Sequence, residues 1–337
     1  MKIFKKSFVF DFGSANTVVS QDGRIVFDEV TMISVWPDGY VDVGEEARRL
    51  RNGEKIGFWG KWAAGECTKT FYPISGGYVA DGRSYEAYVK GVVGKLTKFP
   101  RFCSVVIAVP DDLAISSDNQ IADSAFVDPF RGKGVKDVKA VHQSVAACAG
   151  LGLPSDKYHL LVDIGYGKTR ASLVRGSAVI KTELWQNVSC TTWISDIRNY
   201  IRSQLNLNLG VVTAEMLLVK VAAACDEIDQ APEPCRVTGV SLMTAHPQSV
   251  ELGHKELAKV IDPDLQFLEG ELARFIKEDL MTLSEEVQRD IVSGGIWLIG
   301  GGSRLRGLSG RLEAKLGLPV HTTANPFHII AEGAATV

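Results

Sequence analysis

The sequence predicts an α/β fold made of two related domains, and three observations support this prediction. The chain has 337 residues, which at about 100–200 residues per domain is enough for two large domains. Short apolar, β-branched runs alternate with segments of helical periodicity. A strand that ends in Asp-x-Gly-x-x-x-Thr occurs twice, at 11–17 and at 163–169. Such a repeat is typical of a duplicated domain.

The first half of the chain begins with a strand and a hairpin. Residues 8–10 are apolar and stop at Asp11, and a turn at Asp22-Gly23 separates two further apolar runs. Residues 104–109 are apolar on both faces, which predicts a buried central strand. We expect residues 111–112 and 116–118 to cap a helix after that strand. The expected elements are strands at 8–10, 18–20, 25–27, 104–109 and 136–141, and a closely packed helix at 143–150.

The second half repeats this beginning and then becomes mainly helical. Residues 159–162 form an apolar run that stops at Asp163, and a hairpin is expected after it. Gly317 is a suitable residue to end the last of the helices. The expected strands are 159–162, 170–174, 178–184 and 296–299, and the expected helices are 192–205, 213–225, 265–283, 284–292 and 304–316.

Three glycine-bearing turns have the composition of a phosphate-binding site. Glycines let backbone N–H groups approach a phosphate closely, as at Gly13, Gly165 and Gly167. Ser14 and Thr169 would add hydroxyl donors. Carboxylates at Asp11 and Asp163 would repel bare phosphate, so they predict a hydrated Mg²⁺ ion between them and the nucleotide. The run 300–303, Gly-Gly-Gly-Ser between a strand and a helix, would approach the nucleoside and α-phosphate.

Each turn also has a plainer interpretation, and two familiar motifs do not apply. Asp and Gly are common turn residues, so one turn alone is explained equally well as a strand end. Both copies together with the triple glycine favour the nucleotide. Residues 167–169 are not the end of a P-loop, because position 162 is Val where that motif needs Gly. The triple glycine fails the dinucleotide motif, because its third glycine position is Leu305.

The composition is that of an ordinary globular protein, with 45% hydrophobic and 23% charged residues and a net charge of −3. The sequence contains no stripe of basic residues of the kind that would predict a nucleic-acid partner. The basic start at 1–6 is followed by too short an apolar run for a signal peptide. The sequence also lacks an uncharged apolar stretch of about 18 residues, so it does not predict a transmembrane helix. We therefore expect a cytoplasmic protein.

The cysteines fit the same compartment. None of the six forms a Cys-x-x-Cys pair, and no histidine lies at zinc-ligand spacing from a cysteine pair. Most of these cysteines have apolar neighbours, so we expect them to be small core residues. Free cysteines of this kind fit a protein in the reducing cytosol. The six are Cys67, Cys103, Cys148, Cys190, Cys225 and Cys235.

These motifs together resemble the actin, DnaK-chaperone and sugar-kinase superfamily, and within it the MreB-type bacterial actins. The resemblance covers nearly the whole chain, and 300–308 is also similar to the magnetosome filament actin MamK. It implies an actin-like fold of two ribonuclease-H-like domains around a nucleotide cleft, each with a small inserted subdomain. The matching segments are 11–17, 44–47, 77–81, 105–110, 138–154, 213–215 and 300–308.

The resemblance implies domain boundaries and site residues. Domain IA would comprise 1–29, 76–157 and 322–337, subdomain IB 30–75, domain IIA 158–188 and 252–321, and subdomain IIB 189–251. Asp11, Asp163 and Gln143 would be catalytic; the two aspartates would hold Mg²⁺ through water and Gln143 would orient the attacking water. ATP or ADP would contact Gly13, Ser14, Ala15, Asn16, Gly165, Tyr166, Gly167, Lys168, Thr169, Glu215, Gly300, Gly301, Gly302, Ser303 and Leu305.

The chain departs from the family pattern at several of these positions. His142-Gln143-Ser144 stands where Glu-Glu-Pro is usual, and Tyr166 replaces a glycine. Lys168 and Arg170 stand where small or acidic residues are common. Residues 189–191, Ser-Cys-Thr, occupy a Gly-Gly-Asp-like place, and Leu218 replaces a lysine that contacts the nucleoside. A slow or altered ATPase is therefore the prediction.

The family implies a cytoskeletal ATPase that polymerises into filaments of its own copies. The alternatives are a scaffold that binds nucleotide without hydrolysis and a small-molecule kinase of the same fold. A chaperone is disfavoured because no substrate-binding domain follows. Adaptor proteins of a membrane or organelle are further candidate partners.

A direct membrane contact is the weaker interpretation of residues 95–102. This segment mixes Lys95, Lys98 and Arg101 with Phe99 and Phe102, a composition that anionic lipid attracts. A solvated loop with a phenylalanine in the core is favoured about two to one, because scattered surface apolar residues are common. The localisation expected is cytoplasmic and cytoskeletal, with membrane association as the open alternative.

Overall fold

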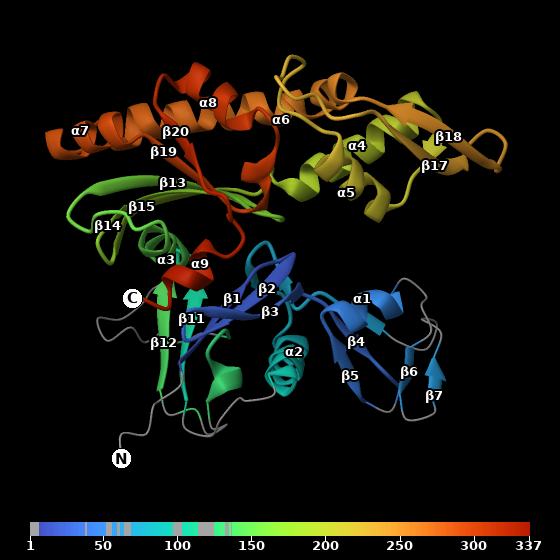
Figure 1. Cartoon of the computed structure of the whole chain (residues 1–337), viewed down its shortest axis with the longest axis horizontal. Coiled ribbons are helices and arrows are strands. Elements are labelled where there is room, and N and C mark those ends of the chain that lie inside the picture. Colours follow the sequence, from blue (N-terminus) through green and yellow to red (C-terminus); the bar gives the residue numbers. More distant parts are fainter. Residues whose placement is uncertain are drawn as a thin grey trace. The chain divides into compact units, whose positions relative to one another are not determined.

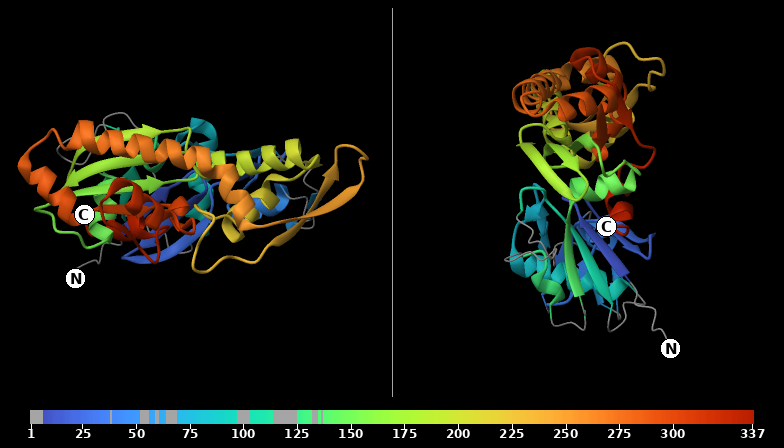
Figure 2. Two further views of the ribbon diagram at one scale, coloured as in Figure 1. Left: turned by 90° about the horizontal axis from the view of Figure 1, so that it is seen from above. Right: turned by 90° about the vertical axis from the view of Figure 1, so that its left-hand side faces the viewer.

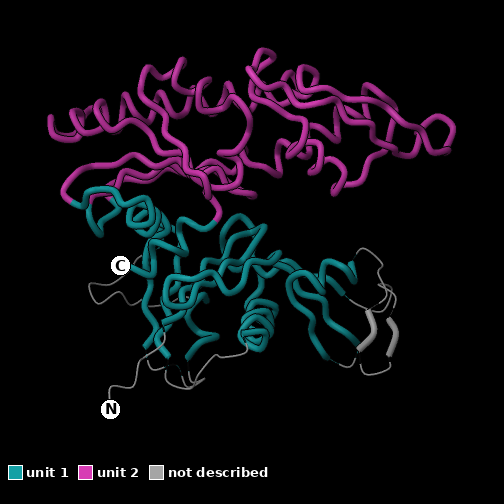
Figure 3. The backbone as a smooth tube through the Cα atoms, in the orientation of Figure 1, with its two compact units in different colours: residues 1–155, 176–179, 328–337 teal, residues 156–175, 180–327 magenta. Residues whose placement is uncertain are grey.

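The structure is a computed structural model that describes residues 7–37, 39–51, 56–58, 61–63, 69–96, 103–113, 125–131, 135 and 137–337. It divides into two compact units (Figure 3). Unit 1 comprises residues 1–155, 176–179 and 328–337, and unit 2 comprises residues 156–175 and 180–327. The predicted division into domains IA and IIA with subdomains IB and IIB stays a prediction.

The main sheet of unit 1 has the strand order β12-β11-β1-β2-β3. β1 pairs in parallel with β11 and antiparallel with β2, and β11 pairs in parallel with β12 (Figure 1). All the strands expected in the first half are confirmed. The bounds are β1 (Ser7–Phe12), β2 (Asn16–Gln21), β3 (Arg24–Val30), β11 (Ser104–Val109) and β12 (Asp137–His142).

Smaller elements complete unit 1. Strands β5, β4 and β8 form a three-stranded sheet, and β6-β7 and β10-β9 are two-stranded. The Asp81 side chain caps α2 by accepting a hydrogen bond from Ser84 N. The elements are β4 (Ile33–Val35), β5 (Val41–Val43), α1 (Glu45–Arg51), β6 (Ile56–Phe58), β7 (Lys61–Ala63), β8 (Lys69–Phe71), β9 (Ile74–Ser75), β10 (Tyr78–Val79), α2 (Gly82–Lys95), η2 (Asp128–Phe130), α3 (Gln143–Gly150) and α9 (Ile329–Gly333).

Helix α3 packs closely on α9, as its small residues predict. A Cβ atom at Gly333 would lie 1.8 Å from the Ala146 carbonyl oxygen, and one at Gly150 would lie 2.2 Å from the Ile329 oxygen. Elsewhere, Phe10 and Phe12 stack with ring centroids 5.6 Å apart and belong to the aromatic core of unit 1. This packing holds the ends of β1 and β12 in place, where the candidate site begins.

The main sheet of unit 2 repeats the order of the first, β15-β14-β13-β19-β20. β13 pairs antiparallel with β14 and parallel with β19, and β19 pairs in parallel with β20. The duplication predicted from the repeated turn is thus present in the strand order of the two sheets. The strands are β13 (Tyr158–Ile164), β14 (Thr169–Arg175), β15 (Ala178–Trp185), β19 (Ile296–Ile299) and β20 (Val320–Thr322).

Long helices cover this sheet. Unit 2 also contains a small three-stranded sheet with the order β16-β17-β18. Figure 2 shows α6 as a long orange helix over the green strands. The η3 segment that continues α6 is a π-helix, and its Phe275 meets Trp185 of β15 edge to face. The elements are α4 (Cys190–Gln204), β16 (Leu207–Asn208), α5 (Val211–Lys220), β17 (Cys235–Ser241), β18 (Pro247–Leu252), α6 (His254–Arg274), η3 (Phe275–Leu280), α7 (Glu285–Gly294), η4 (Gly301–Arg304) and α8 (Leu308–Leu316).

Three expected helix limits were wrong by about four residues or more. The helix expected at 213–225 ends at Lys220, because the buried Ala224 donates its amide to the Arg306 oxygen at 2.7 Å instead of to a helical partner. The helix expected from 304 begins at Leu308, after a 3₁₀ turn and the left-handed Gly307. The helix expected from 265 begins at His254, because Leu257 and Ile261 extend its buried face.

The side chain of Asp111 accepts a hydrogen bond from Ser144 N at 3.0 Å, so it caps α3. The segment that Asp111 was expected to cap lies outside the described residues.

Of the cysteines, Cys103 and Cys148 are buried, whereas Cys190, Cys225 and Cys235 are half-buried. A core role therefore holds for only part of the set.

No helix within the described ranges is long and apolar enough to cross a membrane.

Candidate functional site

The first predicted phosphate turn joins β1 to β2 in unit 1. Gly13 N donates to the Asn16 oxygen at 3.0 Å, and a Cβ atom on Gly13 would lie 2.7 Å from that same oxygen. Thr31, which follows β3 directly, supports the turn through two hydrogen bonds. Its hydroxyl donates to the Gly13 oxygen at 2.6 Å, and its amide donates to the Ala15 oxygen at 2.7 Å. The tightness of the turn therefore requires glycine at position 13.

The polar side chains of this turn are oriented by neighbouring segments. Ser14 Oγ accepts a hydrogen bond from Gly77 N at 2.8 Å, which uses an oxygen lone pair and leaves the hydroxyl proton to be donated. Asn16 is exposed, and its amide donates to Asp28 Oδ1 at 3.2 Å. Asp28 also contacts His328 Nε2 at 2.8 Å through its other oxygen. Ser14 is thus built into the turn, whereas Asn16 belongs to a surface network.

Two predicted catalytic residues of unit 1 lie in direct contact. Asp11 is 8% exposed at the end of β1, and Gln143 is the first residue of α3. Gln143 Nε2 donates to Asp11 Oδ1 at 3.1 Å. The parallel pairing of β1, β11 and β12 brings these residues to one edge of the sheet although 132 positions separate them in the chain. The sequence comparison predicted both residues but not their contact.

The second turn repeats the geometry of the first in unit 2. Gly165 N donates to the Lys168 oxygen at 2.9 Å, and a Cβ atom on Gly165 would lie 3.0 Å from that oxygen. The carbonyls of Gly165 and Tyr166 accept from Cys190 N at 3.1 Å and from Thr191 N at 2.8 Å. The start of α4 thus supports this turn through its backbone, as Thr31 supports the first turn.

The Ser-Cys-Thr run at 189–191 has a structural role that the sequence did not reveal. Ser189 is the N-cap of α4, and it forms a capping box with Thr192, in which each side chain bonds the backbone of the other. Its hydroxyl also bonds that of Thr191, with 2.9 Å between the oxygens. The pattern Ser-x-x-Thr before an amphipathic helix is the signal that would have identified this cap.

Thr169 was predicted to offer a hydroxyl to the nucleotide, but in the structure that hydroxyl has another use. Its side chain is fully buried and donates to the Val188 oxygen at 2.8 Å. The equivalent Thr17 is also fully buried, with its hydroxyl 2.9 Å from that of Thr31. The threonine of the repeated motif therefore fastens the turn to its support in both copies.

The triple glycine is packed against the second turn. Gly300 has φ +77°, and a Cβ atom there would lie 2.2 Å from Asp163 Oδ1. At Gly302 the same atom would lie 2.2 Å from Ile164 Cγ2, and at Gly301 it would lie 3.0 Å from Phe327. The parallel pairing of Asp163 with Ile299 in β19 causes this approach. These glycines are thus explained by their contacts within the protein, in addition to the predicted contact with a nucleotide.

The remaining predicted residues divide between core and site. Ser303 is buried and donates its hydroxyl to the Gly300 oxygen at 2.7 Å. Leu305 is 8% exposed and belongs to the hydrophobic core of unit 2. Glu215 lies half-buried on α5. Of these three, Ser303 and Leu305 serve the architecture of the glycine turn.

Cys190 lies beside the second turn, to which its amide is hydrogen-bonded, and the charge of Glu215 acts on its thiol. Burial, together with the charges of Asp163 and Glu215, raises the pKa of its thiol to about 12. Both carboxylates therefore act on one point next to the turn, and the thiol stays protonated at neutral pH. The sequence predicts Cys190 only as a core residue and does not predict its position beside the site.

A metal ion at these turns would depend on few protein ligands. No cluster of three or more His, Cys, Asp or Glu side chains that could hold a metal is present within the described part of the chain. Mg²⁺ typically uses one or two carboxylates and takes its other ligands from water and phosphate. Each turn supplies one carboxylate, Asp11 in unit 1 and Asp163 in unit 2, and a single carboxylate is compatible with that mode.

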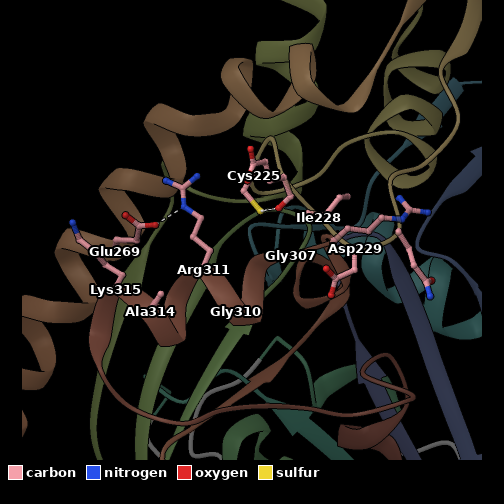
Figure 4. A pocket seen from close by; sticks show the side chains of 12 residues that line it. Cys225, Ile228, Asp229, Glu269, Gly307, Gly310, Arg311, Ala314 and Lys315 are labelled. Atoms are coloured by element: carbon pink, nitrogen blue, oxygen red, sulfur yellow. Dashed lines mark hydrogen bonds and ion pairs between the residues drawn. The ribbon is translucent and has the colours of Figure 1, made fainter.

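A separate pocket of about 1020 Å³ lies in unit 2 (Figure 4). Arg311 extends toward Glu269 with 2.5 Å between Nε and Oε1, and it also pairs with Asp262 at 2.7 Å. None of the predicted site residues lines this pocket. Its lining residues are Cys225, Glu227, Ile228, Asp229, Gln230, Glu269, Arg306, Gly307, Gly310, Arg311, Ala314 and Lys315.

Comparisons with known proteins extend over the whole chain. The family model described as MreB/Mbl protein matches residues 5–337. The cell shape-determining protein Mbl of Bacillus subtilis (strain 168) is 25% identical over 343 residues, which cover 98% of this chain and 95% of that protein.

Solved structures share the fold. MreB5 of Spiroplasma citri bound to ADP has a TM-score of 0.83 at 19% identity, covering 99% of this chain and 96% of that chain. The same protein bound to AMPPNP has a TM-score of 0.81. The MamK double helical filament has a TM-score of 0.77 at 17% identity, and the match covers 98% of each chain.

Proposed function

The chain belongs to the MreB/Mbl protein family, and from that premise we propose that it binds ATP and ADP at the described turns, polymerises into filaments and hydrolyses ATP slowly. It is a homologue of the cytoskeletal actins, with the actin-like α/β fold that its sequence predicts. The observation that carries the proposal is the duplicated turn, with an aspartate, a glycine and an external backbone support in each unit.

The geometry of the turns supports a polyphosphate ligand. Each turn is closed by a Gly N–H to carbonyl bond and is held from outside by a second segment, so its backbone needs little rearrangement on binding. A rigid backbone that presents N–H groups is the arrangement that binds phosphate oxygens well. MreB5, which shares the fold, was solved with ADP and with AMPPNP. We infer that each turn is suited to bind phosphate groups of a nucleotide.

Mg²⁺ belongs to this proposal as the partner of Asp11 and Asp163. When bound, the ion would neutralise charge on the phosphates and let two carboxylates approach them. The chain supplies hard oxygen ligands for it, and Asp11 is fixed by its bond from Gln143. Asp163 is fixed by the close approach of Gly300.

Slow hydrolysis follows from the chemistry of Gln143. Its amide nitrogen is held by Asp11, so its carbonyl oxygen is the end that can accept a hydrogen bond from an attacking water. An amide oxygen orients a water but does not take up its proton at neutral pH, so it cannot act as a general base. Positioning and electrostatics supply most of phosphoryl transfer, which is why a glutamine can still support a low rate.

A scaffold that binds nucleotide without hydrolysis is the second candidate. The observation that favours it is the absence of a general base at position 143, combined with the use of the Thr169 hydroxyl inside the turn. A small-molecule kinase of the same fold is a third and weaker possibility, and it would require a phosphate acceptor.

We further propose a cytoplasmic, cytoskeletal location with copies of the chain as the main partner and adaptor proteins as additional partners. Direct membrane contact through 95–102 stays a secondary proposal. Lys95 ends α2 and bonds Glu29 at 2.8 Å and also Glu46. Its charge is therefore balanced within unit 1. Residues 97–102, with both phenylalanines, lie outside the described residues.

Sedimentation of the full-length chain with ATP, ADP and a non-hydrolysable ATP analogue, with phosphate release measured in the same samples, tests these proposals. We expect polymer in the pellet with ATP and with the analogue, and slow phosphate release with ATP alone. Polymer without any phosphate release would favour the scaffold. A chain that never sediments under any nucleotide condition would contradict the filament proposal, and phosphate transfer that needs an added acceptor would indicate a kinase.

A further inference from the structure

The C-terminal segment of the chain is linked to the first phosphate turn through one carboxylate. Asp28 of β3 accepts a hydrogen bond from Asn16 Nδ2 on its Oδ1 at 3.2 Å, and its Oδ2 lies 2.8 Å from His328 Nε2. Asn16 begins β2 and is one of the predicted nucleotide contacts, whereas His328 directly precedes α9. Segments from opposite ends of the chain therefore share the two oxygens of Asp28.

The pairing of β2 with β3 explains why Asp28 reaches Asn16. In this antiparallel pair, Asp28 lies opposite Val18, and Asn16 is two residues before Val18. Such diagonal neighbours lie on the same face of the sheet, within reach of longer side chains. The 3.2 Å hydrogen bond between the two side chains is consistent with that placement.

The segment that carries His328 is fixed within unit 1. Helix α9 contacts β1, β2 and β3 as well as α3 (Figure 1). The buried Ser20 of β2 donates its hydroxyl to the Ala331 oxygen at 3.1 Å, and glycines bring α3 and α9 into close contact. The side chain of His328 is itself only 21% exposed. His328 is therefore held in place beside Asp28 by the packing of α9.

These contacts determine how the Asn16 amide is presented at the turn. A carboxylate only accepts hydrogen bonds, so the nitrogen of the amide, and not its oxygen, faces Asp28. That nitrogen has a second hydrogen, which a phosphate oxygen can accept. Because His328 occupies the other carboxylate oxygen, it keeps Asp28 in the orientation that Asn16 uses.

From these contacts we propose that His328 and Asp28 are positioning residues for the nucleotide, so that the segment 328–337 sets the affinity of the first turn; this rests on the proposed function, in which Asn16 contacts the nucleotide. Neither His328 nor Asp28 touches the ligand in this scheme. His328 orients Asp28, and Asp28 orients Asn16. Loss of His328 therefore weakens binding only while Asn16 is present.

The test is a double-mutant cycle on the affinity of the full-length chain for a fluorescent ATP derivative in excess MgCl₂. The four chains are wild type, Asn16→Ala, His328→Ala and the double variant. We expect His328→Ala to weaken binding about three- to tenfold when Asn16 is present, and less than about 1.5-fold when position 16 is alanine. A purely structural effect of His328 would weaken binding equally in both backgrounds.

Two further variants make the result specific. His328→Gln keeps an N–H donor near the position of the imidazole Nε2 and should bind within about twofold of wild type. His254→Ala in unit 2 removes another histidine that bonds a distant segment, with Nε2 3.1 Å from the Asp226 oxygen, and should leave the affinity unchanged. Circular dichroism melting shows which variants fold. If His328→Ala is unfolded, His328→Phe, which keeps a ring without its nitrogens, takes its place in the cycle.

The outcomes separate the positioning role from nucleotide binding itself. Equal effects of the His328 substitution in both backgrounds, or no effect in either, would overturn the positioning role. An Asn16→Ala chain that binds as tightly as wild type would overturn it as well. In each of these cases the wild-type chain still binds the nucleotide. Absence of binding by the wild-type chain would instead contradict the proposed function.

Discussion

Gln143 Nε2 donates a hydrogen bond to Asp11 Oδ1 across a distance of 3.1 Å, and this bond joins the start of α3 to the end of β1. It fixes which end of the amide faces the carboxylate, because only the nitrogen can donate. The proposed water-orienting group and the proposed metal-binding group of unit 1 therefore depend on each other. Five predictions follow from this and related contacts.

Removal of the amide should affect hydrolysis more than binding. For Gln143→Ala we expect phosphate release to fall by about 10- to 100-fold, because the attacking water loses its orientation. Nucleotide affinity should change by less than about threefold, since the turn backbone is untouched. Gln143→Glu should release phosphate faster than the wild-type chain, because a carboxylate can accept the proton. Single-turnover phosphate release and a nucleotide titration measure the two quantities. The control is Gln266→Ala, which changes an exposed residue of α6. Unchanged release in Gln143→Ala would refute the assigned role.

The glycine turn should not tolerate a methyl group at Gly300. An alanine there would place Cβ 2.2 Å from Asp163 Oδ1 at a φ of +77°, and such backbone strain costs about 1–3 kcal/mol of unfolding free energy before the clash is counted. Urea denaturation and nucleotide titration of Gly300→Ala should both show a loss. Gly310→Ala on α8, where nothing lies within 4 Å, should instead be neutral or stabilising by up to about 1 kcal/mol. Equal effects of the two substitutions would argue against the close approach.

The cap of α4 should matter to the second turn. Ser189→Ala removes an N-cap and should lower the free energy of unfolding by about 1 kcal/mol. It should also weaken nucleotide binding several-fold, because α4 supports the turn through Cys190 N and Thr191 N. Ser284→Ala removes the cap of α7, which bonds Val287 N, and should cost similar stability with no effect on the nucleotide. Thermal melting and titration of both variants distinguish a general from a local effect.

A carboxyl pair on α4 and α6 should make stability depend on pH. Burial, with the nearby Asp264 charge and its hydrogen bond, raises the pKa of Asp196 to about 6. Asp264 Oδ2 is buried and has no hydrogen-bond partner among the described residues. Because the folded pKa lies above the unfolded value of about 3.9, the contribution is fully present below pH 4. It is lost as pH rises through 6.

The magnitude of this contribution is modest, because Asp196 is only half-buried and solvent screens it; we expect at most about 1 kcal/mol. Asp196→Asn should stabilise the protein at pH 8 and have little effect near pH 4, as measured by urea unfolding across that range. Asp229→Asn is the control on a different surface. A stability difference between Asp196→Asn and wild type that is constant with pH would contradict the prediction.

Cys190 should be unreactive in the native protein. With the pKa of its thiol raised to about 12, very little thiolate is present at pH 8, whereas an unfolded cysteine has a pKa near 8.5. Iodoacetamide should therefore label Cys190 more than about a hundredfold more slowly in buffer than in urea, since the thiolate is the nucleophile. Peptide mass spectrometry follows the labelling of each cysteine separately. Rapid native labelling of Cys190 would show that burial and the charges of Asp163 and Glu215 do not keep its thiol protonated.

Elements whose signal is local could be predicted from the sequence. The strands at 104–109 and 296–299 and the helix at 143–150 have the predicted limits, because an apolar run between breakers, or a run of small residues, determines them without distant partners. The duplication is visible for the same reason, since each copy of the turn repeats the constraints of a tight turn within seven residues. The family follows from the motifs in their order along the chain.

Other features depended on segments that are distant in the chain. Helix α5 ends where it does because of a hydrogen bond to Arg306. The two turns are supported by Thr31 and by the start of α4. Gln143 meets Asp11 because the strands before them pair in parallel. The buried hydroxyl of Thr169 and the position of Arg170 opposite Asp163 also needed the fold. The sequence by itself determined that two glycine turns with an aspartate exist and what family they belong to, because those are local patterns. Only the tertiary structure decided which polar groups support the turns and which residue lies opposite each aspartate, because hydrogen-bond partners and strand register are fixed by packing between residues far apart in the chain.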